Sequence, residues 1–211
     1  RDKTSGGTGN TVIDALLHVA GKTYEFEDET LKALDFDHKR VITVTCHRRE
    51  NLGEHMANIF SAIADIAREF SDVEVVYPIH LNSKVREEAD RYLGGIPNIH
   101  MIEPLSYQPM VNLMARSFFI LTDSGGLQEE APALGKPVLV VRRETERPEA
   151  VEAGTARLAG VDRATVYKLA KELLTDQAAY EAMAKAVNPY GDGQACSRIV
   201  EAIKAYFEQQ S

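Results

Sequence analysis

The sequence has 211 residues, of which 44% are hydrophobic and 27% are charged, a balance typical of a globular protein with one substantial core. The formal net charge of −8 argues against a nucleic-acid-binding protein, and no run approaches the roughly 18 apolar residues of a membrane span. Two cysteines far apart, Cys46 and Cys196, do not suggest a disulfide framework, so we expect a cytoplasmic protein.

The first 39 residues precede the regular part of the chain. Residues 1–9 are polar and glycine-rich, which predicts a disordered leader or a cloning remnant. Apolar residues at helical spacing predict a helix over residues 11–20, which Asn10 could cap. An acidic, mixed stretch follows, so residues 10–39 are interpreted as helix and connector, and residues 40–211 as the main domain.

From Arg40 onward, short β-rich runs alternate with helical segments. We predict strands at residues 41–46, 73–79, 99–102, 118–122, 138–141 and 156–158. We predict helices at residues 53–70, 83–92, 107–115, 127–134 and 148–153, and further helices within residues 164–185. Such alternation implies right-handed crossovers, and therefore an α/β fold with one doubly wound parallel sheet flanked by helices. In these sheets ligands bind beyond the C-terminal ends of the strands.

The strand, turn and helix at residues 121–134 contain the clearest candidate ligand site. Gly125 and Gly126 follow Ser124 and lack a Cβ, so backbone can approach a ligand closely, and the amides that open the helix can point at a phosphate. Glu130, about one helical turn further on, could accept hydrogen bonds from sugar hydroxyls. A Ser-Gly-Gly turn is also common in parallel α/β domains, and the glutamates could form a solvated helix face.

Three other groups follow predicted strand ends. His47, Arg48 and Arg49 combine proton chemistry with fixed positive charge that suits phosphate, although a solvated basic loop has the same composition. His80 could face the same crevice or be a hydrogen-bonded structural residue. Arg147 lies in a charged loop that leaves the same sheet edge as the glycine turn, so it could reach the ligand.

Two further segments each allow two interpretations, and the histidines bear on metal binding. Leu105 and Tyr107 could form an apolar slot for a planar base or could be ordinary core. Residues 188–194 could be a hinge or a turn before a final amphipathic helix that bears Ile199, Ile203 and Phe207. The six histidines are scattered without paired ligand spacing, which gives little support to a metal site.

Five motifs, in matching order, resemble those of the non-hydrolysing UDP-N-acetylglucosamine 2-epimerases. They are TGNTVIDA at residues 8–15, HRREN at 47–51, DSGGLQEEAP at 123–132, TERPE at 145–149 and NPYGDG at 188–193. The fold of that family resembles the two-domain GT-B glycosyltransferases. The resemblance therefore implies that this chain is the C-terminal, Rossmann-like half of a GT-B-like fold.

The resemblance also implies a reaction. The family interconverts UDP-N-acetylglucosamine and UDP-N-acetylmannosamine by eliminating UDP to leave an enzyme-bound 2-acetamidoglucal, then adding UDP back, without a metal or redox cofactor. His47 would contact the UDP phosphates and assist the leaving group, and Glu130 would hold the ribose. The phosphate-binding residues would be Ser124, Gly125 and Gly126, with Arg147 as a further ligand contact.

Two more implications concern regulation and completeness. Arg48 and His80 resemble contacts of a second, activating UDP-N-acetylglucosamine. Family members are nearly twice as long, and their N-terminal domain supplies the carboxylates that act at C2. We therefore expect a nucleotide-binding half that is inert alone, because elimination needs an acid and a base placed on the sugar. The family forms homodimers partly through that domain, so this chain by itself could be a monomer. The rival interpretations are a GT-B glycosyltransferase fragment and a non-catalytic nucleotide-sugar sensor.

Overall fold

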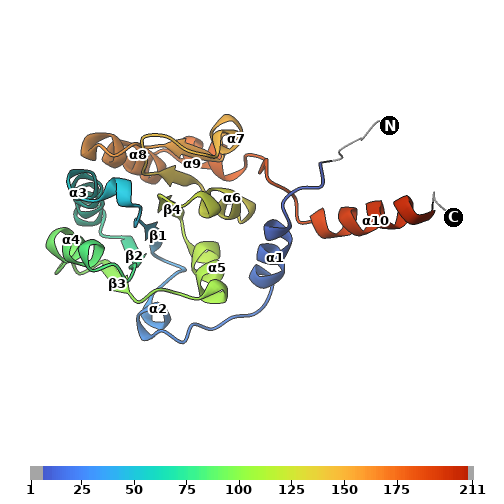
Figure 1. Cartoon of the computed structure of the whole chain (residues 1–211). Helices are drawn as coiled ribbons and strands as arrows, with labels where there is room; N and C mark the ends of the chain where they lie inside the picture. Colours follow the sequence, from blue (N-terminus) through green and yellow to red (C-terminus); the bar gives the residue numbers. More distant parts are fainter. Residues whose placement is uncertain (1–6, 209–211) are drawn as a thin grey trace.

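The computed structural model describes residues 7–208, which form a parallel sheet with helices on both faces (Figure 1). Its strands are β1 (Arg40–Thr45), β2 (Val73–Pro78), β3 (Ile99–Ile102), β4 (Phe119–Thr122), β5 (Val138–Val140) and β6 (Ala156–Leu158). The strand order is β3-β2-β1-β4-β5-β6, and every neighbouring pair is parallel. The chain thus builds outward from β1, then returns to add β4 on the other side of β1. The order reverses between β1 and β4, and this reversal is where doubly wound sheets bind ligands.

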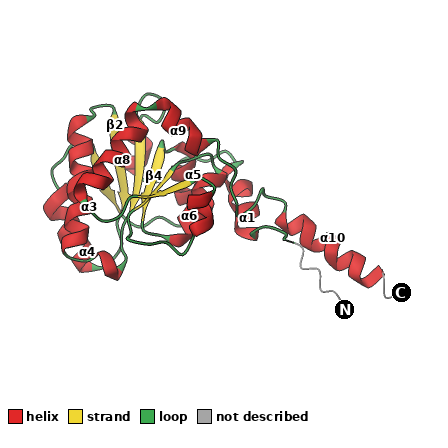
Figure 2. Cartoon of the chain, turned by 90° about the horizontal axis from the view of Figure 1, so that it is seen from above, coloured by secondary structure: helices red, strands yellow, loops and turns green. Residues whose placement is uncertain are grey.

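The helices divide between the two faces of the sheet (Figure 2). One face is covered by α3 (Glu54–Glu69), α4 (Ser83–Leu93), α8 (Arg163–Thr175) and α9 (Gln177–Ala184). The other is covered by α1 (Thr11–Ala20), α2 (Glu29–Ala33), α5 (Tyr107–Arg116), α6 (Gly125–Ala133) and α7 (Pro148–Glu152). The 3-10 turn η1 (Arg49–Asn51) follows β1, and α10 (Ala195–Glu208) ends the described chain. The prediction of a doubly wound α/β fold is confirmed.

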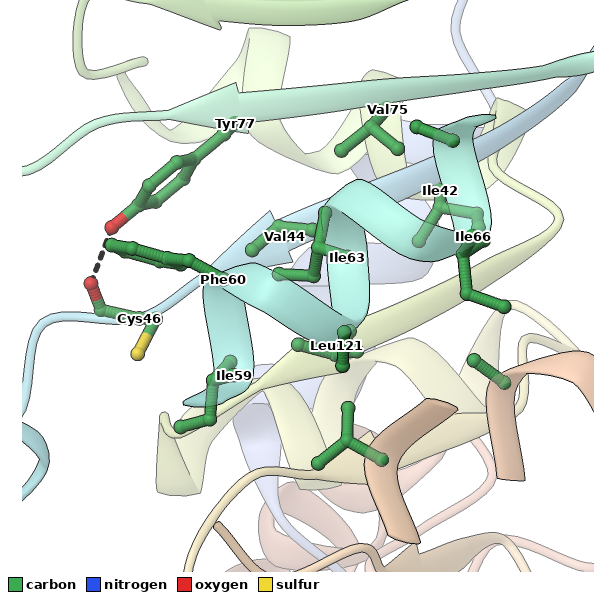
Figure 3. Packing of buried hydrophobic residues seen from close by; sticks show 14 of the residues in the cluster. Ile42, Val44, Cys46, Ile59, Phe60, Ile63, Ile66, Val75, Tyr77 and Leu121 are labelled. Carbon is green, nitrogen blue, oxygen red and sulfur yellow. Dashed lines mark hydrogen bonds between the residues drawn. The ribbon is translucent and has the colours of Figure 1, made fainter. Parts of the chain in front are cut away.

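Alternating side chains of the central strands fill both cores. Ile42 and Val44 of β1 lie in the core beneath α3, whereas Val41 lies in the core on the opposite face. Phe60 and Ile63 of α3 pack onto the first of these cores (Figure 3). Because both faces are covered, β4 and β5 are buried at every position and are almost wholly apolar. The central strand β1 also contains the buried Thr43, whose hydroxyl bonds with that of Ser117.

The structure corrects three expectations about secondary structure. The helix predicted to begin at residue 127 begins at Gly125, so both glycines belong to its first turn. The supposed connector contains the short helix α2, whose Leu31 is buried with Phe26. The arginine of α5, Arg116, holds this segment in place, since its guanidinium lies 4.7 Å from the Phe26 ring centroid. The turn η1 was not predicted because three residues carry no usable periodicity.

Both ends of the described chain meet beside α1. Asn10 caps α1 as predicted, and its backbone N–H donates to the Tyr190 carbonyl at 2.7 Å. Asp14 of α1 accepts from the first amides of α10, at Ala195 and Cys196. Beyond this attachment α10 projects from the body (Figures 1 and 2), and its most exposed apolar side chains are Val200, Ile203, Tyr206 and Phe207. Residues 1–6 of the expected leader lie outside the described residues.

None of the helices within residues 7–208 combines the length and apolar character needed to cross a membrane.

Candidate functional site

The loops that follow β1 and β4 enclose a cavity at the point where the strand order reverses. His47 comes two residues after β1 ends, and Ser124 comes two residues after β4 ends. The cavity has a volume of about 260 Å³ and is lined by Thr45, Cys46, His47, Tyr77, Pro78, His80, Pro104, Leu105, Met110, Ser124 and Leu127. Four strand ends thus contribute to one cavity, whose lining combines polar residues such as His47 and Ser124 with apolar ones such as Leu105 and Met110.

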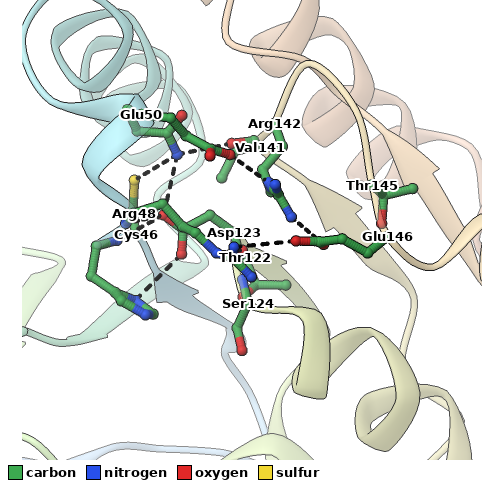
Figure 4. A network of polar contacts seen from close by, with 12 residues as sticks. Cys46, Arg48, Glu50, Thr122, Asp123, Ser124, Val141, Arg142, Thr145 and Glu146 are labelled. Carbon is green, nitrogen blue, oxygen red and sulfur yellow. Dashed lines mark hydrogen bonds and ion pairs between the residues drawn. The ribbon is translucent and has the colours of Figure 1, made fainter.

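The buried carboxylate of Asp123 ties the two central loops together. Its Oδ2 accepts from the backbone N–H of His47 at 2.8 Å and of Arg48 at 2.7 Å. The same oxygen accepts from the Asn51 side-chain amide at 3.1 Å, and this amide also donates to the Val141 carbonyl. Figure 4 shows this network around Asp123. Asp123 therefore fixes the backbone positions of His47 and Arg48.

Sequence reasoning did not single out Asp123 or Asn51. Both belong to motifs that were noticed, since Asp123 precedes the glycine turn and Asn51 follows the basic cluster. An acidic residue directly before a glycine turn was the available signal. It was not used because the partners of Asp123 lie 72 to 76 residues earlier in the chain.

Two arginines converge on the start of α6. A Cβ added to Gly125 would lie 3.9 Å from the Arg147 guanidinium and 3.9 Å from an Nη atom of Arg48. Ser124 is the N-cap residue, and within the described chain its side chain makes no capping hydrogen bond. The first amides of a helix are free to bind an anion, and its dipole favours negative charge there. The arrangement therefore combines backbone N–H groups with two guanidinium forks, which suits phosphate oxygens.

Carboxylates hold these arginines in position. Arg48 pairs with Glu146 at 3.2 Å and donates from Nε to the Asp123 carbonyl. Glu146 also pairs with Arg142, which in turn pairs with Glu50 at 2.7 Å (Figure 4). Its own backbone N–H and the Arg142 guanidinium hold the pKa of Glu146 below its usual range. Glu146 therefore remains an anion that orients Arg48 beside the start of α6.

The adjacent glutamates of α6 have different environments. Glu129 is only 8% exposed, accepts from Arg147 Nε, and accepts from the Asn10 amide at 2.6 Å. Its backbone carbonyl accepts from Asn188, so it also fastens the loop before α10. Glu130 is half-buried one turn from Gly126, and burial followed by the neighbouring Glu129 raises its pKa. Glu129 therefore belongs to a network that holds Arg147, a role the sequence did not separate from that of Glu130.

The two histidines lie face to face in the cavity. The ring centroids of His47 and His80 are 5.2 Å apart, and the ring planes differ by 8°. His47 Nδ1 lies 3.3 Å from Asp123 Oδ1. His80 accepts from the backbone N–H of Asn82, so it is both a lining residue and a hydrogen-bonded one. The two alternatives that the sequence left open for His80 are therefore not exclusive.

The two segments that the sequence left undecided, around Leu105 and at residues 188–194, have clear positions in the structure. Leu105 lines the cavity, while Tyr107 at the start of α5 is not among the lining residues. Residues 188–194 form a turn in which Gly191 and Gly193 have positive φ angles. A Cβ at Gly191 would lie 3.3 Å from the Asn10 backbone nitrogen, so glycine permits the close approach of the two chain segments. Within residues 7–208 no cluster of three or more metal-ligating side chains was found.

Comparison with known proteins gives a consistent result. The sequence model of a family described as UDP-N-acetylglucosamine 2-epimerase matches residues 6–204. A UDP-N-acetylglucosamine 2-epimerase of Bacillus subtilis is 54% identical over 200 residues, which are 95% of this chain and 52% of that protein. The chain therefore spans about half the length of the curated relatives it matches.

Solved structures are similar over the same extent. The Staphylococcus aureus MnaA–UDP co-structure has a TM-score of 0.86 and 48% identity, and the match covers 95% of this chain and 54% of that one. A UDP-GlcNAc 2-epimerase from Neisseria meningitidis bound to UDP-GlcNAc has a TM-score of 0.83 and 44% identity, with 94% and 54% covered.

Proposed function

Because the chain belongs to the UDP-N-acetylglucosamine 2-epimerase family, we propose that residues 40–211 form a UDP-binding domain whose diphosphate site is the start of α6. The observation that carries this proposal is the convergence of Arg48 and Arg147 on Gly125. A phosphate there receives hydrogen bonds from backbone amides and from two guanidinium groups, in place of water. Solved relatives described with UDP or UDP-GlcNAc support the choice of nucleotide.

The proposed contacts follow the order of groups along the nucleotide. Ser124, Gly125 and Gly126 bind the diphosphate at the helix start, and Arg147 contacts it from the side. Glu130, one turn along α6, accepts hydrogen bonds from the ribose hydroxyls. The apolar side of the cavity, which includes Leu105, receives less polar parts of the ligand.

The proposed reaction is the interconversion of UDP-N-acetylglucosamine and UDP-N-acetylmannosamine. UDP leaves as an anion and later returns, so the enzyme must stabilise charge that develops on the departing phosphate. His47 lines the cavity next to Ser124, and its role is to assist this leaving group as a proton donor. No metal or redox cofactor takes part in the proposed reaction.

Two further residues are assigned to regulation. Arg48 and His80 contact a second, activating UDP-N-acetylglucosamine beside the substrate. His80 is suited to this role because it stacks on His47 and thus lies next to the catalytic group. Arg48 is suited because it lies beside Gly125, so in this proposal it contacts both the substrate diphosphate and the second nucleotide sugar, while Glu146 pairs with it at 3.2 Å.

The 211 residues are proposed to be inactive alone. Removal and return of a proton at C2 need an acid and a base on the sugar, and in this proposal those groups belong to the part of the relatives that the chain does not cover. The exposed apolar side chains of α10, such as Ile203 and Tyr206, are proposed to pack against that part. A cytoplasmic location fits a nucleotide-sugar substrate.

Two measurements test the proposal. NMR of the chain mixed with UDP-N-acetylglucosamine should show no UDP-N-acetylmannosamine, and turnover would refute inactivity. Calorimetry should show weak UDP binding that Arg147→Ala reduces at least about 10-fold, since hydrogen bonds to charged groups contribute about 1.5–3 kcal/mol. Arg157→Ala is the matched control, because Arg157 pairs with Glu172 and is 36% exposed at its side chain, compared with 34% for Arg147.

Equal loss in both variants would refute the site. Tight binding of the intact nucleotide sugar by this chain alone would instead favour a non-catalytic sensor. Transfer of the sugar to an added acceptor would favour a GT-B glycosyltransferase fragment.

A further inference from the structure

The two carboxylate oxygens of Asp123 have unequal surroundings. Asp123 is fully buried, and its Oδ2 accepts three hydrogen bonds from the loop after β1. Its Oδ1 is also buried, but among residues 7–208 no donor makes a well-formed hydrogen bond with it. His47 Nδ1 lies 3.3 Å from this oxygen. The buried Cys46 thiol also interacts with the Asp123 carboxylate. Leaving a buried carboxylate oxygen without a donor costs free energy, so the geometry favours a proton on His47 Nδ1.

Two contacts orient the His47 ring, whose side chain is 40% exposed. The His47 backbone N–H donates to Asp123 Oδ2, and the ring lies beside Oδ1. His80 stacks on one face of the ring, with 5.2 Å between the ring centroids. With Nδ1 beside the carboxylate, the other ring nitrogen, Nε2, is the one available to a ligand in the cavity.

We propose that Asp123 is a positioning residue that accepts the Nδ1 proton of His47 and so presents Nε2 to the cavity. Held in this orientation, Nε2 can bind a ligand oxygen in the cavity. This second consequence rests on the proposed function, in which Nε2 faces a UDP phosphate. Asp123 itself touches no ligand and acts through His47.

Several other groups lie near His47. Arg48 is adjacent in the chain, and the His80 ring stacks on the His47 ring. Burial raises the pKa of the Cys46 thiol, and burial likewise raises the pKa of the Tyr77 hydroxyl, so both remain neutral. Asp123 is therefore the negative group that lies next to the ring.

The tautomer of His47 tests the proposal without any ligand. Nitrogen-15 NMR of the labelled chain should show the neutral His47 ring protonated at Nδ1, with the signal assigned by its loss in His47→Gln. In Asp123→Asn the amide oxygen can keep the three donors while the amide NH₂ faces His47, so the proton should move to Nε2. A wild-type ring protonated at Nε2 overturns the proposal, even if the variant does not fold. An unchanged tautomer in a folded variant overturns it too.

A remote carboxylate and histidine pair provides the matched control. Glu74 lies 2.7 Å from His100 Nε2, away from the cavity. Glu74→Gln should change the His100 signals and leave those of His47 as they are. A change at His47 in this control would mean that the signals report general loosening and would overturn the interpretation.

Addition of UDP tests the second consequence. When UDP is added to the wild-type chain, the nitrogen-15 signal of His47 Nε2 should move more than that of Nδ1. This preference for Nε2 should be lost in Asp123→Asn. A preference for Nε2 that persists in Asp123→Asn overturns the role of Asp123. Absence of UDP binding to the wild type refutes the proposed function instead, and the tautomer measurement still decides the role of Asp123.

Discussion

Replacing Gly125 by alanine separates ligand binding from folding. Gly125 is the first residue of α6, and it is not one of the glycines with a positive φ angle, so alanine fits the backbone. The nearest atoms to the added Cβ belong to the guanidinium groups of Arg147 and Arg48, each at 3.9 Å, which is an ordinary contact distance. The substitution therefore fills the space between two arginines without a clash.

The expected magnitudes follow from these contacts. Alanine favours a helix over glycine by up to about 1 kcal/mol, which corresponds to a rise of about 2–4 °C in melting temperature for a domain of this size. The methyl group occupies the position where a phosphate would meet the amides and both guanidinium groups. Loss of one charge-assisted hydrogen bond costs about 1.5–3 kcal/mol, so UDP affinity should fall about 10- to 100-fold.

Calorimetry with UDP and thermal denaturation followed by circular dichroism measure the two effects on the same samples. Gly7→Ala is the control, because nothing lies within 4 Å of a Cβ added there. It should change neither quantity. Unchanged UDP affinity in a folded Gly125→Ala protein would refute the diphosphate site, and a large fall in melting temperature would refute the geometry around Gly125.

Three other substitutions test the core, the arginine network and the acid sensitivity. Phe60→Ala should lower the free energy of unfolding in urea by about 3–5 kcal/mol because Phe60 is fully buried, whereas Val187→Ala at a residue 83% exposed should change it by less than about 0.5 kcal/mol. Glu129→Gln should weaken UDP binding several-fold, since Arg147 loses its charged partner, and unchanged affinity would contradict this network. The hydrogen bond with Arg198 lowers the pKa of Asp192 to about 2, so its contribution to stability is complete above about pH 4 and is lost toward pH 2. Acid unfolding followed by circular dichroism should show that Asp192→Asn loses less stability between about pH 4 and pH 2 than the wild type does. Identical acid-unfolding curves would refute this contribution of Asp192.

Local patterns were sufficient for much of the fold. The alternation of apolar runs and helical periodicity predicted all six strands, and most helices to within two residues. Asn10 was identified as a cap from its position alone and does cap α1. These features depend on neighbouring residues, so a single sequence contains them. The short helix α2 was missed because its stability comes from contacts of Phe26 and Leu31 with residues far along the chain.

The candidate site was only partly predictable. His47, His80 and Ser124 were expected at strand ends, and the structure places all three around one cavity. Their proximity depends on β1 and β4 being neighbours, which no local pattern specifies. The sequence also could not show that Glu129 faces Arg147 while Glu130 is free of that pair, since this depends on how α6 packs.

The sequence by itself therefore determined most of the elements, their order and the ends of the strands to within one residue, because hydrophobic periodicity and turn chemistry act over a few positions. Only the tertiary structure decided that Asp123 binds the loop after β1 and that two arginines separated by nearly a hundred residues meet over Gly125. The reason is that burial of a charged group is settled by the strand order and by the surfaces that cover it. A one-dimensional pattern contains neither.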